Sequence, residues 1–128
     1  MKALVADRSA TTRRVVIRAL RVVGVQDVLE FSDVTAAMTA LAGDPEFVIL
    51  EWTAAGDEAL QAVSDLRSRE SGSRTKVIVM SERDRRSDLE RALALGIQGY
   101  LLKPFETRVL VEQLAMAMQA GESGTEAA

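Results

Sequence analysis

Short apolar runs alternate with longer segments of helical spacing along this chain, and this alternation constrains the fold more than any other feature. The predicted strands are residues 3–6, 25–31, 47–50, 77–80 and 99–102. The predicted helices are residues 11–23, 34–42, 57–69, 84–95 and 106–119. Parallel neighbouring strands need a crossover connection, so the alternation predicts an α/β fold with helices on both faces of a parallel sheet. For 128 residues we predict a flavodoxin-like (βα)5 three-layer sandwich with strand order 2-1-3-4-5.

Glycine, proline and capping residues mark the ends of these elements. Gly24 is placed to end the first helix. Ser32 and Asp33 are candidate caps of the second helix. Residues 43–45 and 71–73 combine Gly, Asp, Pro and Ser and are predicted loops. The second strand alternates apolar and polar residues, which predicts a place near an edge of the sheet.

The size and composition fit one globular domain. Hydrophobic residues make up 48% of the chain and charged residues 27%, a balance typical of a folded domain. We predict one domain over residues 1–119 and a flexible polar tail over residues 120–128.

The composition also excludes several kinds of chemistry and of partner. Cysteine and histidine are both absent, so there is no thiolate nucleophile, no histidine base and no cysteine or histidine metal site. A net charge of −3 argues against a nucleic-acid partner. No apolar run approaches the roughly 20 residues that span a bilayer, and the N-terminus does not resemble a signal peptide. We therefore expect a cytoplasmic protein without a membrane partner.

Four polar residues follow predicted strands at the points where the strands end. They are Asp7, Glu51, Ser81 and Lys103. The carboxyl ends of parallel strands meet at one edge of the sheet, where ligands bind in such folds. Asp7 and Ser81 could instead cap the helices that follow them, and Glu51 could be a solvated strand end. Taken together, the four positions favour a shared site for an anion, with or without a divalent cation.

The motifs around these residues resemble those of a known family. ADRSATTRR follows the first strand, EW ends the third, MS ends the fourth and GYLLKPF covers the fifth. With these motifs the chain resembles the receiver domain of two-component response regulators, most closely the single-domain chemotaxis type. The resemblance extends from Lys2 to about Gln119.

The resemblance implies a phosphoacceptor site around Glu51. In a working receiver, an aspartate at the position of Glu51 accepts a phosphoryl group from a histidine kinase. Acids at the positions of Ala6 and Asp7 hold Mg²⁺, together with the acceptor and the backbone carbonyl at Thr53. In this chain the resemblance therefore leaves Asp7, Glu51 and Thr53 as a vestigial magnesium site.

The same resemblance implies a switch that links the site to the surface. The hydroxyl at Ser81 and the ammonium at Lys103 would bind phosphoryl oxygens. Tyr100 would move inward as Ser81 moves, which would change the face formed by the fourth helix, fifth strand and fifth helix.

The chain departs from the family at residues that carry the chemistry. Glu51 replaces the acceptor aspartate, and Ala6 replaces one of the two metal-binding acids. Three further departures lie nearby. They are Ala55 in place of a common proline, Ala59 in place of a common glycine, and Glu82 in place of a small residue.

These departures weaken phosphoryl transfer in three ways. Phosphoryl transfer depends mainly on positioning and charge neutralisation, and a displacement of ~1 Å can cost about a hundredfold in rate. Glu51 carries its carboxylate one methylene farther from the backbone than aspartate does. Ala6 removes an oxygen ligand, and Mg²⁺ relies on one or two carboxylates. Glu82 adds a negative charge at the mouth of the pocket, which would repel a phosphodonor.

We therefore predict an atypical pseudo-receiver that is not an enzyme, has no cofactor and binds Mg²⁺ weakly at most. The longer Glu51 could reach Lys103 directly, or approach Ser81, and close the pocket with the protein's own side chains. The alternative within the family is a residual Mg²⁺-dependent phosphoacceptor. Whether the closed pocket has an on-like or an off-like shape stays open.

If the chemistry is lost, binding to other proteins remains as the function. The predicted partner surface carries Arg85, Arg86, Leu89, Arg91, Tyr100, Arg108 and Val111. Expected partners are a histidine kinase, a chemotaxis component or an output protein, and a homodimer through the same face is possible. The alternative is a solvated helix whose opposite charges pair with one another.

Other classes of function find less support in the sequence. A hydrolase using Asp7 or Glu51 would lack a histidine and a second acid at a useful spacing. A flavin- or nucleotide-binding protein would need a Gly-rich or Ser/Thr-rich phosphate loop, which is missing. The arginines of the first helix solvate its surface in our interpretation. They are Arg8, Arg13, Arg14, Arg18 and Arg21.

Overall fold

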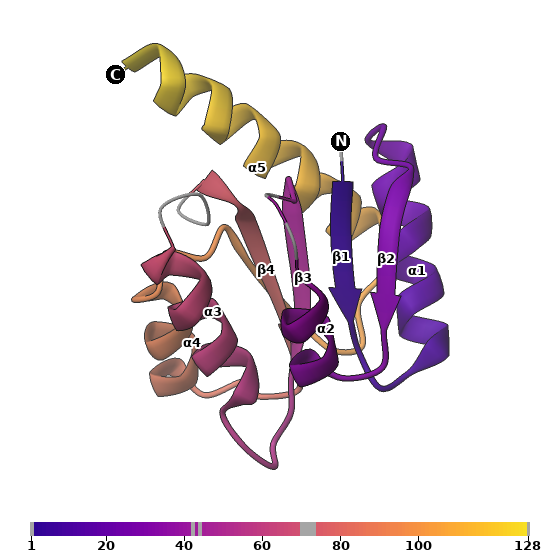
Figure 1. Cartoon of the computed structure of the whole chain (residues 1–128), viewed down its shortest axis with the longest axis vertical. Helices are drawn as coiled ribbons and strands as arrows, with labels where there is room; N and C mark the ends of the chain where they lie inside the picture. Colours follow the sequence, from indigo (N-terminus) through magenta and orange to yellow (C-terminus); the bar gives the residue numbers. More distant parts are fainter. Residues whose placement is uncertain (1, 42, 44, 70–73, 128) are drawn as a thin grey trace.

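Five parallel strands form the central sheet of the computed structural model, which describes residues 2–41, 43, 45–69 and 74–127. The strands are β1 (Lys2–Ala6), β2 (Asp27–Phe31), β3 (Phe47–Trp52), β4 (Lys76–Ser81) and β5 (Gly99–Leu102). Their order is β2-β1-β3-β4-β5, which confirms the predicted flavodoxin-like topology and the edge position of the second strand. The carboxyl ends of the strands lie along the lower edge of the sheet in Figure 1.

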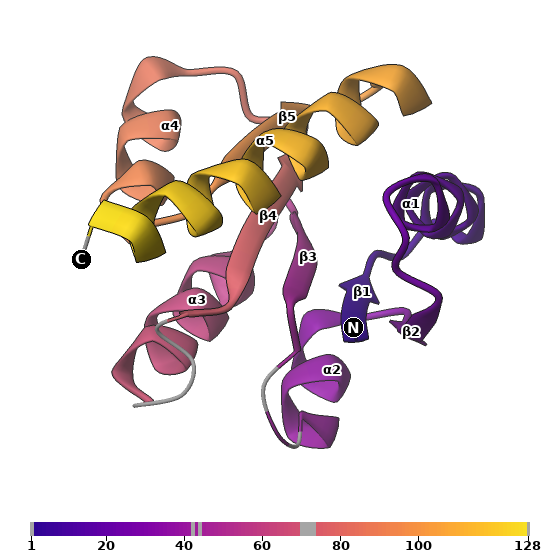
Figure 2. The ribbon, with the colours of Figure 1, turned by 90° about the horizontal axis from the view of Figure 1, so that it is seen from above.

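Helices cover both faces of this sheet. They are α1 (Ala10–Val22), α2 (Val34–Ala40), α3 (Glu58–Ser68), α4 (Arg86–Leu93) and α5 (Thr107–Ala127). Figure 2 shows α1 and α5 on one face and α2 and α3 on the other. Each face has its own hydrophobic core: one includes residues of α1 and α5, and the other includes residues of α2, α3 and α4. The predicted three-layer arrangement is therefore confirmed.

Alternation along β3 decides which core each of its side chains enters. Phe47 and Ile49 belong to the core under α1 and α5, whereas Leu50 and Trp52 belong to the core under α3. Successive side chains of a strand point to opposite faces. Glu51 therefore points to the α1/α5 side at the end of the strand.

The neighbouring strands repeat this pattern. Val5 and Leu101 lie in the α1/α5 core, so Asp7 and Lys103, two residues farther along, are directed to the same side. Ala6 belongs to the opposite core and is fully buried. Strand alternation thus brings both acids and the lysine together on one side of the rim.

Several predicted boundaries differ from those of the structure. The second strand begins at Asp27 instead of residue 25, because Val25 is buried in the α1/α5 core from the preceding loop. The fourth helix is shorter than predicted: it spans Arg86–Leu93, and residues 94–96 form a turn. The predicted end of the last helix at Gln119 is wrong, because α5 continues to Ala127. No proline interrupts that segment, so the helix can continue although two glycines within it disfavour helix.

The capping predictions have mixed outcomes. Asp33 caps α2, with its side chain accepting from the backbone N–H of Ala36 at 2.7 Å. The cap of α1 is Ser9 instead of Asp7, and α4 starts without a side-chain cap, so Ser81 caps no helix. Gly24 follows α1 with a φ of +92°, a conformation that side chains disfavour.

Some predictions fall outside the described residues. They are the loop at 71–73, Ala42 at the end of the predicted second helix, and Asp44 in the loop after it. The division at residue 119 into a domain and a flexible tail stays a prediction. Within the described part of the chain, no helix combines the length and apolar character needed to cross a membrane.

Candidate functional site

The four polar residues predicted to share a site lie at the carboxyl ends of their strands. Asp7, Glu51 and Ser81 are buried, and the side chain of Lys103 is 13% exposed. The backbone N–H of Asp7 donates to the carbonyl of Phe31, and that of Lys103 donates to the carbonyl of Ser81, at 3.1 and 2.8 Å. These bonds continue the sheet pairing by one residue, so the functional side chains start from a fixed backbone.

The ammonium of Lys103 lies between the two acids. Its Nζ is 2.6 Å from Asp7 Oδ2 and 2.8 Å from Glu51 Oε2. Burial works against the charged ammonium, but its hydrogen bonds to Asp7 and Glu51 and their negative charges raise the pKa of Lys103 above its usual value. The contact between Glu51 and Lys103 is one of the two that we considered for the longer side chain.

Arg8 binds the same glutamate from the turn after β1. Its backbone N–H and its Nε donate to Glu51 Oε1 at 3.0 and 3.2 Å, and its Nη2 donates to Oε2 at 3.3 Å. Burial alone would raise the pKa of Glu51, but the hydrogen bonds from Arg8 and Lys103 outweigh it and lower the pKa to about 2. Glu51 is therefore held as a carboxylate by two cations.

Asp7 completes this group, which we call the carboxylate cluster (Asp7, Arg8, Glu51 and Lys103). Besides the ion pair to Lys103, Asp7 Oδ1 accepts from the backbone N–H of Ser9 at 2.8 Å. The cluster contains two carboxylates and two cations, so its formal charges balance. We predicted Arg8 as one of the arginines that solvate the first helix; instead it precedes α1 and binds Glu51, although its side chain is 70% exposed. Its position directly after Asp7 was the available signal for a place in the site.

Ser81 lies apart from the carboxylate cluster. Its hydroxyl donates to the carbonyl of Trp52 at 2.7 Å and accepts from the backbone N–H of Arg83 at 3.0 Å. This arrangement follows from strand alternation, since Ser81 has the opposite parity to Met80, which lies in the α1/α5 core. Glu51 thus reaches Lys103, while Ser81 is bonded elsewhere.

The donors implied for Mg²⁺ do not fit a divalent cation in this arrangement. Both carboxylates already face an ammonium or a guanidinium, and the carbonyl of Thr53 accepts from Arg83 Nε at 3.1 Å. Ala6 offers no ligand. Within residues 2–41, 43, 45–69 and 74–127, no three acidic side chains gather as a metal site. Weak or absent Mg²⁺ binding stays a prediction.

Two hollows flank Glu51. One, of about 340 Å³, opens toward α2 and α3 and is lined by Ala6, Thr53 and Ala59 among others. The second, of about 620 Å³, opens toward α1 and the loop after β5, with Glu82 in its wall. Glu51 and Arg8 line both hollows, so their contacts form part of the wall between them.

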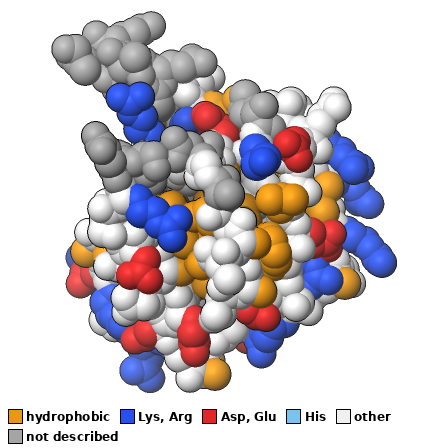
Figure 3. Space-filling model, viewed as in Figure 1, with side chains coloured by type: hydrophobic (Ala, Val, Ile, Leu, Met, Phe, Trp, Pro, Cys, Tyr) orange, Lys and Arg blue, Asp and Glu red, His pale blue; other side chains and the backbone are white. Residues whose placement is uncertain are grey.

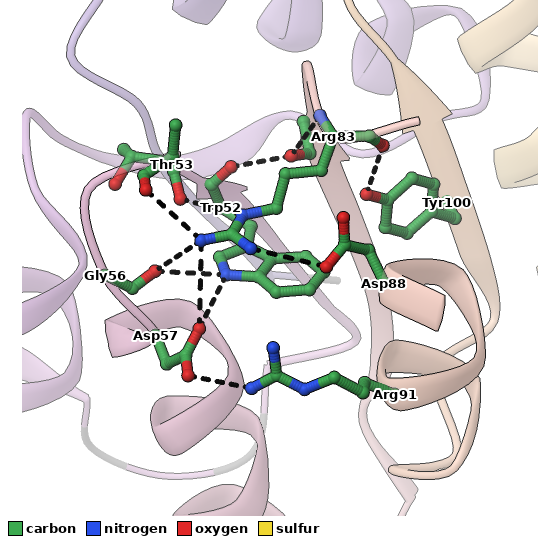
Figure 4. A network of polar contacts seen from close by, with 10 residues as sticks. Trp52, Thr53, Gly56, Asp57, Arg83, Asp88, Arg91 and Tyr100 are labelled. Carbon is green, nitrogen blue, oxygen red and sulfur yellow. Dashed lines mark hydrogen bonds and ion pairs between the residues drawn. The ribbon is translucent and has the colours of Figure 1, made fainter. Parts of the chain in front are cut away.

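Tyr100 and Trp52 belong to a second network at the same rim (Figure 4). The Tyr100 hydroxyl donates to the carbonyl of Arg83 at 2.7 Å, and the two aromatic rings meet edge to face with centroids 6.4 Å apart. Burial raises the pKa of Tyr100. The ring is half-buried and directed toward Trp52.

The predicted partner surface has a mixed character. Arg86 pairs with Glu90, Arg108 pairs with Glu112, and both are highly exposed, as expected for a solvated helix. Leu89 is exposed, whereas Val111 is half-buried against the α1/α5 core. Arg85 is exposed, and Arg91 pairs with Asp57 at 2.7 Å. Two further leucines, Leu93 on α4 and Leu102 on β5, are exposed but were not among the predicted surface residues.

One face of the molecule shows how charged and hydrophobic side chains are distributed over α2 and α3. On the face that carries α2 and α3, hydrophobic side chains gather near the centre, with acidic and basic side chains interspersed around them (Figure 3). Mixed signs of this kind are typical of a solvated surface.

Known proteins are similar to this chain in sequence and in fold. The family model for the response regulator receiver domain matches residues 3–115. Chemotaxis protein CheY-3 of Vibrio cholerae is 30% identical over 89% of this chain and 88% of its own length. Chemotaxis protein CheY1 of Helicobacter pylori is 30% identical over 92% of this chain and 97% of its own. A response regulator from Thermotoga maritima has a similar structure, with a TM-score of 0.79, 26% identity, and coverage of 92% and 97% of the two chains.

Proposed function

This chain belongs to the response regulator receiver domain family, and from that premise we propose that it is a signalling module that works through phosphorylation-independent binding to other proteins. Receiver domains serve two-component and chemotaxis signalling, and the relatives reported above include chemotaxis proteins. The family match favours this function over the flavin- or nucleotide-binding alternative.

The position of Lys103 carries the proposal. Its ammonium contacts both Asp7 and Glu51, at 2.6 and 2.8 Å. Arg8 donates two hydrogen bonds to the other carboxylate oxygen of Glu51, Oε1. An entering metal ion or phosphoryl group would have to displace one of these cations. Breaking a buried ion pair leaves an uncompensated charge, which is costly. Lys103, whose side chain is 13% exposed, and Arg8, whose side chain is 70% exposed, therefore both oppose the binding events that phosphorylation requires.

The length of Glu51 supports the same conclusion. In-line phosphoryl transfer needs the acceptor oxygen at a fixed place relative to the leaving group. Glu51 carries its carboxylate one methylene farther out, and both of its oxygens are bound by Arg8 or Lys103. Ala6 supplies no charge to hold a metal against the incoming phosphodonor. Glu51 is thus a structural anion at the position of an acceptor.

The function then rests on protein partners. We propose a histidine kinase, a chemotaxis component or an output protein as the partner of the surface formed by α4, β5 and α5, or a second copy of the chain. Exposed Leu93 and Leu102 add apolar area to this surface, and removing apolar area from water favours association.

Mass spectrometry of the intact protein after incubation with acetyl phosphate and Mg²⁺ tests the proposal. We expect the wild type to gain no phosphoryl group. The matched control is the double variant Ala6→Asp/Glu51→Asp, which restores the acidic residues of a working receiver and should gain one. A phosphoryl group on Glu51 of the wild type would establish the alternative, a residual Mg²⁺-dependent phosphoacceptor.

A further inference from the structure

Arg83 lies in the segment between β4 and α4, and its side chain crosses to the loop between β3 and α3 (Figure 4). No motif in the sequence predicted a role for this residue. Its side chain is only 20% exposed, whereas that of Arg86, three residues later, is 91% exposed. An arginine this enclosed at the rim of the site needs a physical explanation.

The guanidinium binds the β3–α3 loop through several backbone carbonyls. Arg83 Nε donates to the carbonyl of Thr53 at 3.1 Å, and Nη2 donates to those of Ala54 and Gly56, each at 3.4 Å. Nη1 donates to Asp88 Oδ1 on α4 at 3.3 Å. A planar fork of five N–H donors suits such divergent acceptors, which a lysine could not reach together.

The same guanidinium lies over the indole ring of Trp52. Its central carbon is 4.3 Å from the ring centroid, within the range of a cation–π contact. Trp52 is 1% exposed, and its Nε1 donates to the carbonyl of Gly56 at 3.1 Å. The side chain of Arg83 thus ties the end of β3, the loop after it and the start of α4 into one unit.

The backbone of Arg83 forms the other half of the connection. Its N–H donates to Ser81 Oγ, and its carbonyl accepts from the Tyr100 hydroxyl at 2.7 Å. The position of that carbonyl depends on the conformation of the β4–α4 segment. The side-chain contacts of Arg83 hold this segment against the β3–α3 loop. Side chain and backbone together link Trp52 to Tyr100 on β5.

We propose that Arg83 is a positioning residue that holds Tyr100 inward, and with it the surface formed by α4, β5 and α5, in one conformation without phosphorylation. The proposal rests on the proposed function, because it explains how a chain with a closed carboxylate cluster can present a constant binding surface. Arg83 acts here through internal contacts instead of through contact with a partner.

The chain contains one tyrosine and one tryptophan, so spectroscopy can follow the network without ambiguity. In protein labelled with fluorotyrosine, the fluorine NMR spectrum reports Tyr100 alone. We expect one resonance in the wild type. Arg83→Ala should shift it toward the position of the unfolded protein and change the Trp52 emission. Arg86→Ala, the matched control, should leave both signals as in the wild type.

Two further variants keep the test decisive if Arg83→Ala does not fold. Arg83→Lys keeps the positive charge but loses the planar set of guanidinium donors. Asp88→Asn weakens the contact between the guanidinium and α4. At a temperature where they are folded, both variants should shift the Tyr100 resonance in the same direction as Arg83→Ala. An unchanged Tyr100 resonance in folded Arg83 variants, with only their melting temperature lowered, would reduce Arg83 to a stabilising residue and overturn the proposal.

The phosphorylation experiment separates this inference from the function on which it rests. A phosphoryl group on Glu51 of the wild type would overturn the proposed function. The positioning role of Arg83 would still be tested separately by the fluorine resonance of Tyr100. An unphosphorylated wild type whose Tyr100 resonance ignores Arg83 would overturn only the inference.

Discussion

The backbone N–H and the guanidinium Nε of Arg8 both donate to the same oxygen of Glu51, Oε1, at 3.0 and 3.2 Å. This double contact closes the turn after β1 onto the end of β3, two segments that lie 43 residues apart in the sequence. Because Glu51 Oε2 also receives the ammonium of Lys103, the glutamate connects β1, β3 and β5. Glu51 is therefore important for stability, and the following predictions test its contacts and those of the Arg83 network.

Stability should fall in acid because of Glu51. Its pKa is about 2 in the folded protein against 4.5 in a model compound, so the folded state favours the ionised form. This contribution is complete above pH 4.5 and is lost as the pH falls from 4.5 toward 2. At about 1.4 kcal/mol per pKa unit, it amounts to about 3 kcal/mol. Urea denaturation of wild type and Glu51→Gln across this range measures it.

Glu51→Gln is the control for that experiment, because it removes the titrating group and nearly keeps the shape. Its stability should depend less on pH between 4.5 and 2 than that of the wild type. Parallel curves for the two proteins would mean that the contacts of Glu51 contribute no measurable linkage.

Lys103→Met should destabilise the protein strongly. The change leaves Asp7 and Glu51 buried with one cation fewer, and breaking such an arrangement costs about 3–5 kcal/mol. Lys2→Met, at an exposed position, should change the free energy of unfolding by no more than ~0.5 kcal/mol. Adding Glu51→Gln to Lys103→Met should recover part of the loss. Equal effects of the two lysine changes would contradict the charge-balanced cluster.

Mg²⁺ should leave the fluorescence of the wild type unchanged. Trp52 directly follows Glu51 and is the single tryptophan of the chain, so its emission reports binding at the rim. The double variant Ala6→Asp/Glu51→Asp should show saturable quenching, because it supplies the carboxylates that Mg²⁺ needs. Millimolar quenching of the wild type that disappears in Asp7→Ala would show that the vestigial site still binds the metal.

Tyr100→Phe should lower the free energy of unfolding by about 1 kcal/mol, the net value of a typical hydrogen bond. The hydroxyl donates to the carbonyl of Arg83 at 2.7 Å, while the edge-to-face contact of the ring with Trp52 would persist. Urea denaturation followed by Trp52 emission measures the difference. A variant as stable as the wild type would indicate that water replaces this bond without loss.

A homodimer through α4, β5 and α5 can be tested at the exposed leucines. Leu102, 49% exposed on β5, would become buried in such a dimer, so Leu102→Asp should weaken self-association in sedimentation equilibrium. Val22→Asp changes a residue of similar exposure at the end of α1 and serves as the control. If neither change, or both equally, affected the sedimentation mass, the proposed dimer face would be wrong.

The apolar runs and turn residues predicted the alternation of strands and helices, and the order usual for a flavodoxin-like sheet of this size predicted the strand order. The strand ends predicted that Asp7, Glu51 and Lys103 lie together, whereas Ser81 stands at the same rim but apart from them. Helix ends were less accurate, as at Ala127, because intrinsic helix propensity only weakly determines where a helix stops.

The two arginines that shape the site were not predicted, for a physical reason. Arg8 and Arg83 bind acceptors 43 and 30 residues away in the sequence. Each has several rotatable bonds and, in an extended turn, could equally point into solvent. Nothing in the neighbouring residues distinguishes Arg83 from Arg86, although one is largely enclosed and the other is 91% exposed.

The sequence by itself determined the sheet, its order and which polar groups stand at its carboxyl edge, since hydrophobic period and turn chemistry act over a few residues. Only the tertiary structure decided which cation neutralises which acid, and that Arg83 crosses to the β3–α3 loop. Which contacts a long charged side chain makes depends on the acceptors that the folded backbone places within its reach. A contact forms only where its favourable free energy exceeds the cost of the side-chain rotamer entropy that it removes.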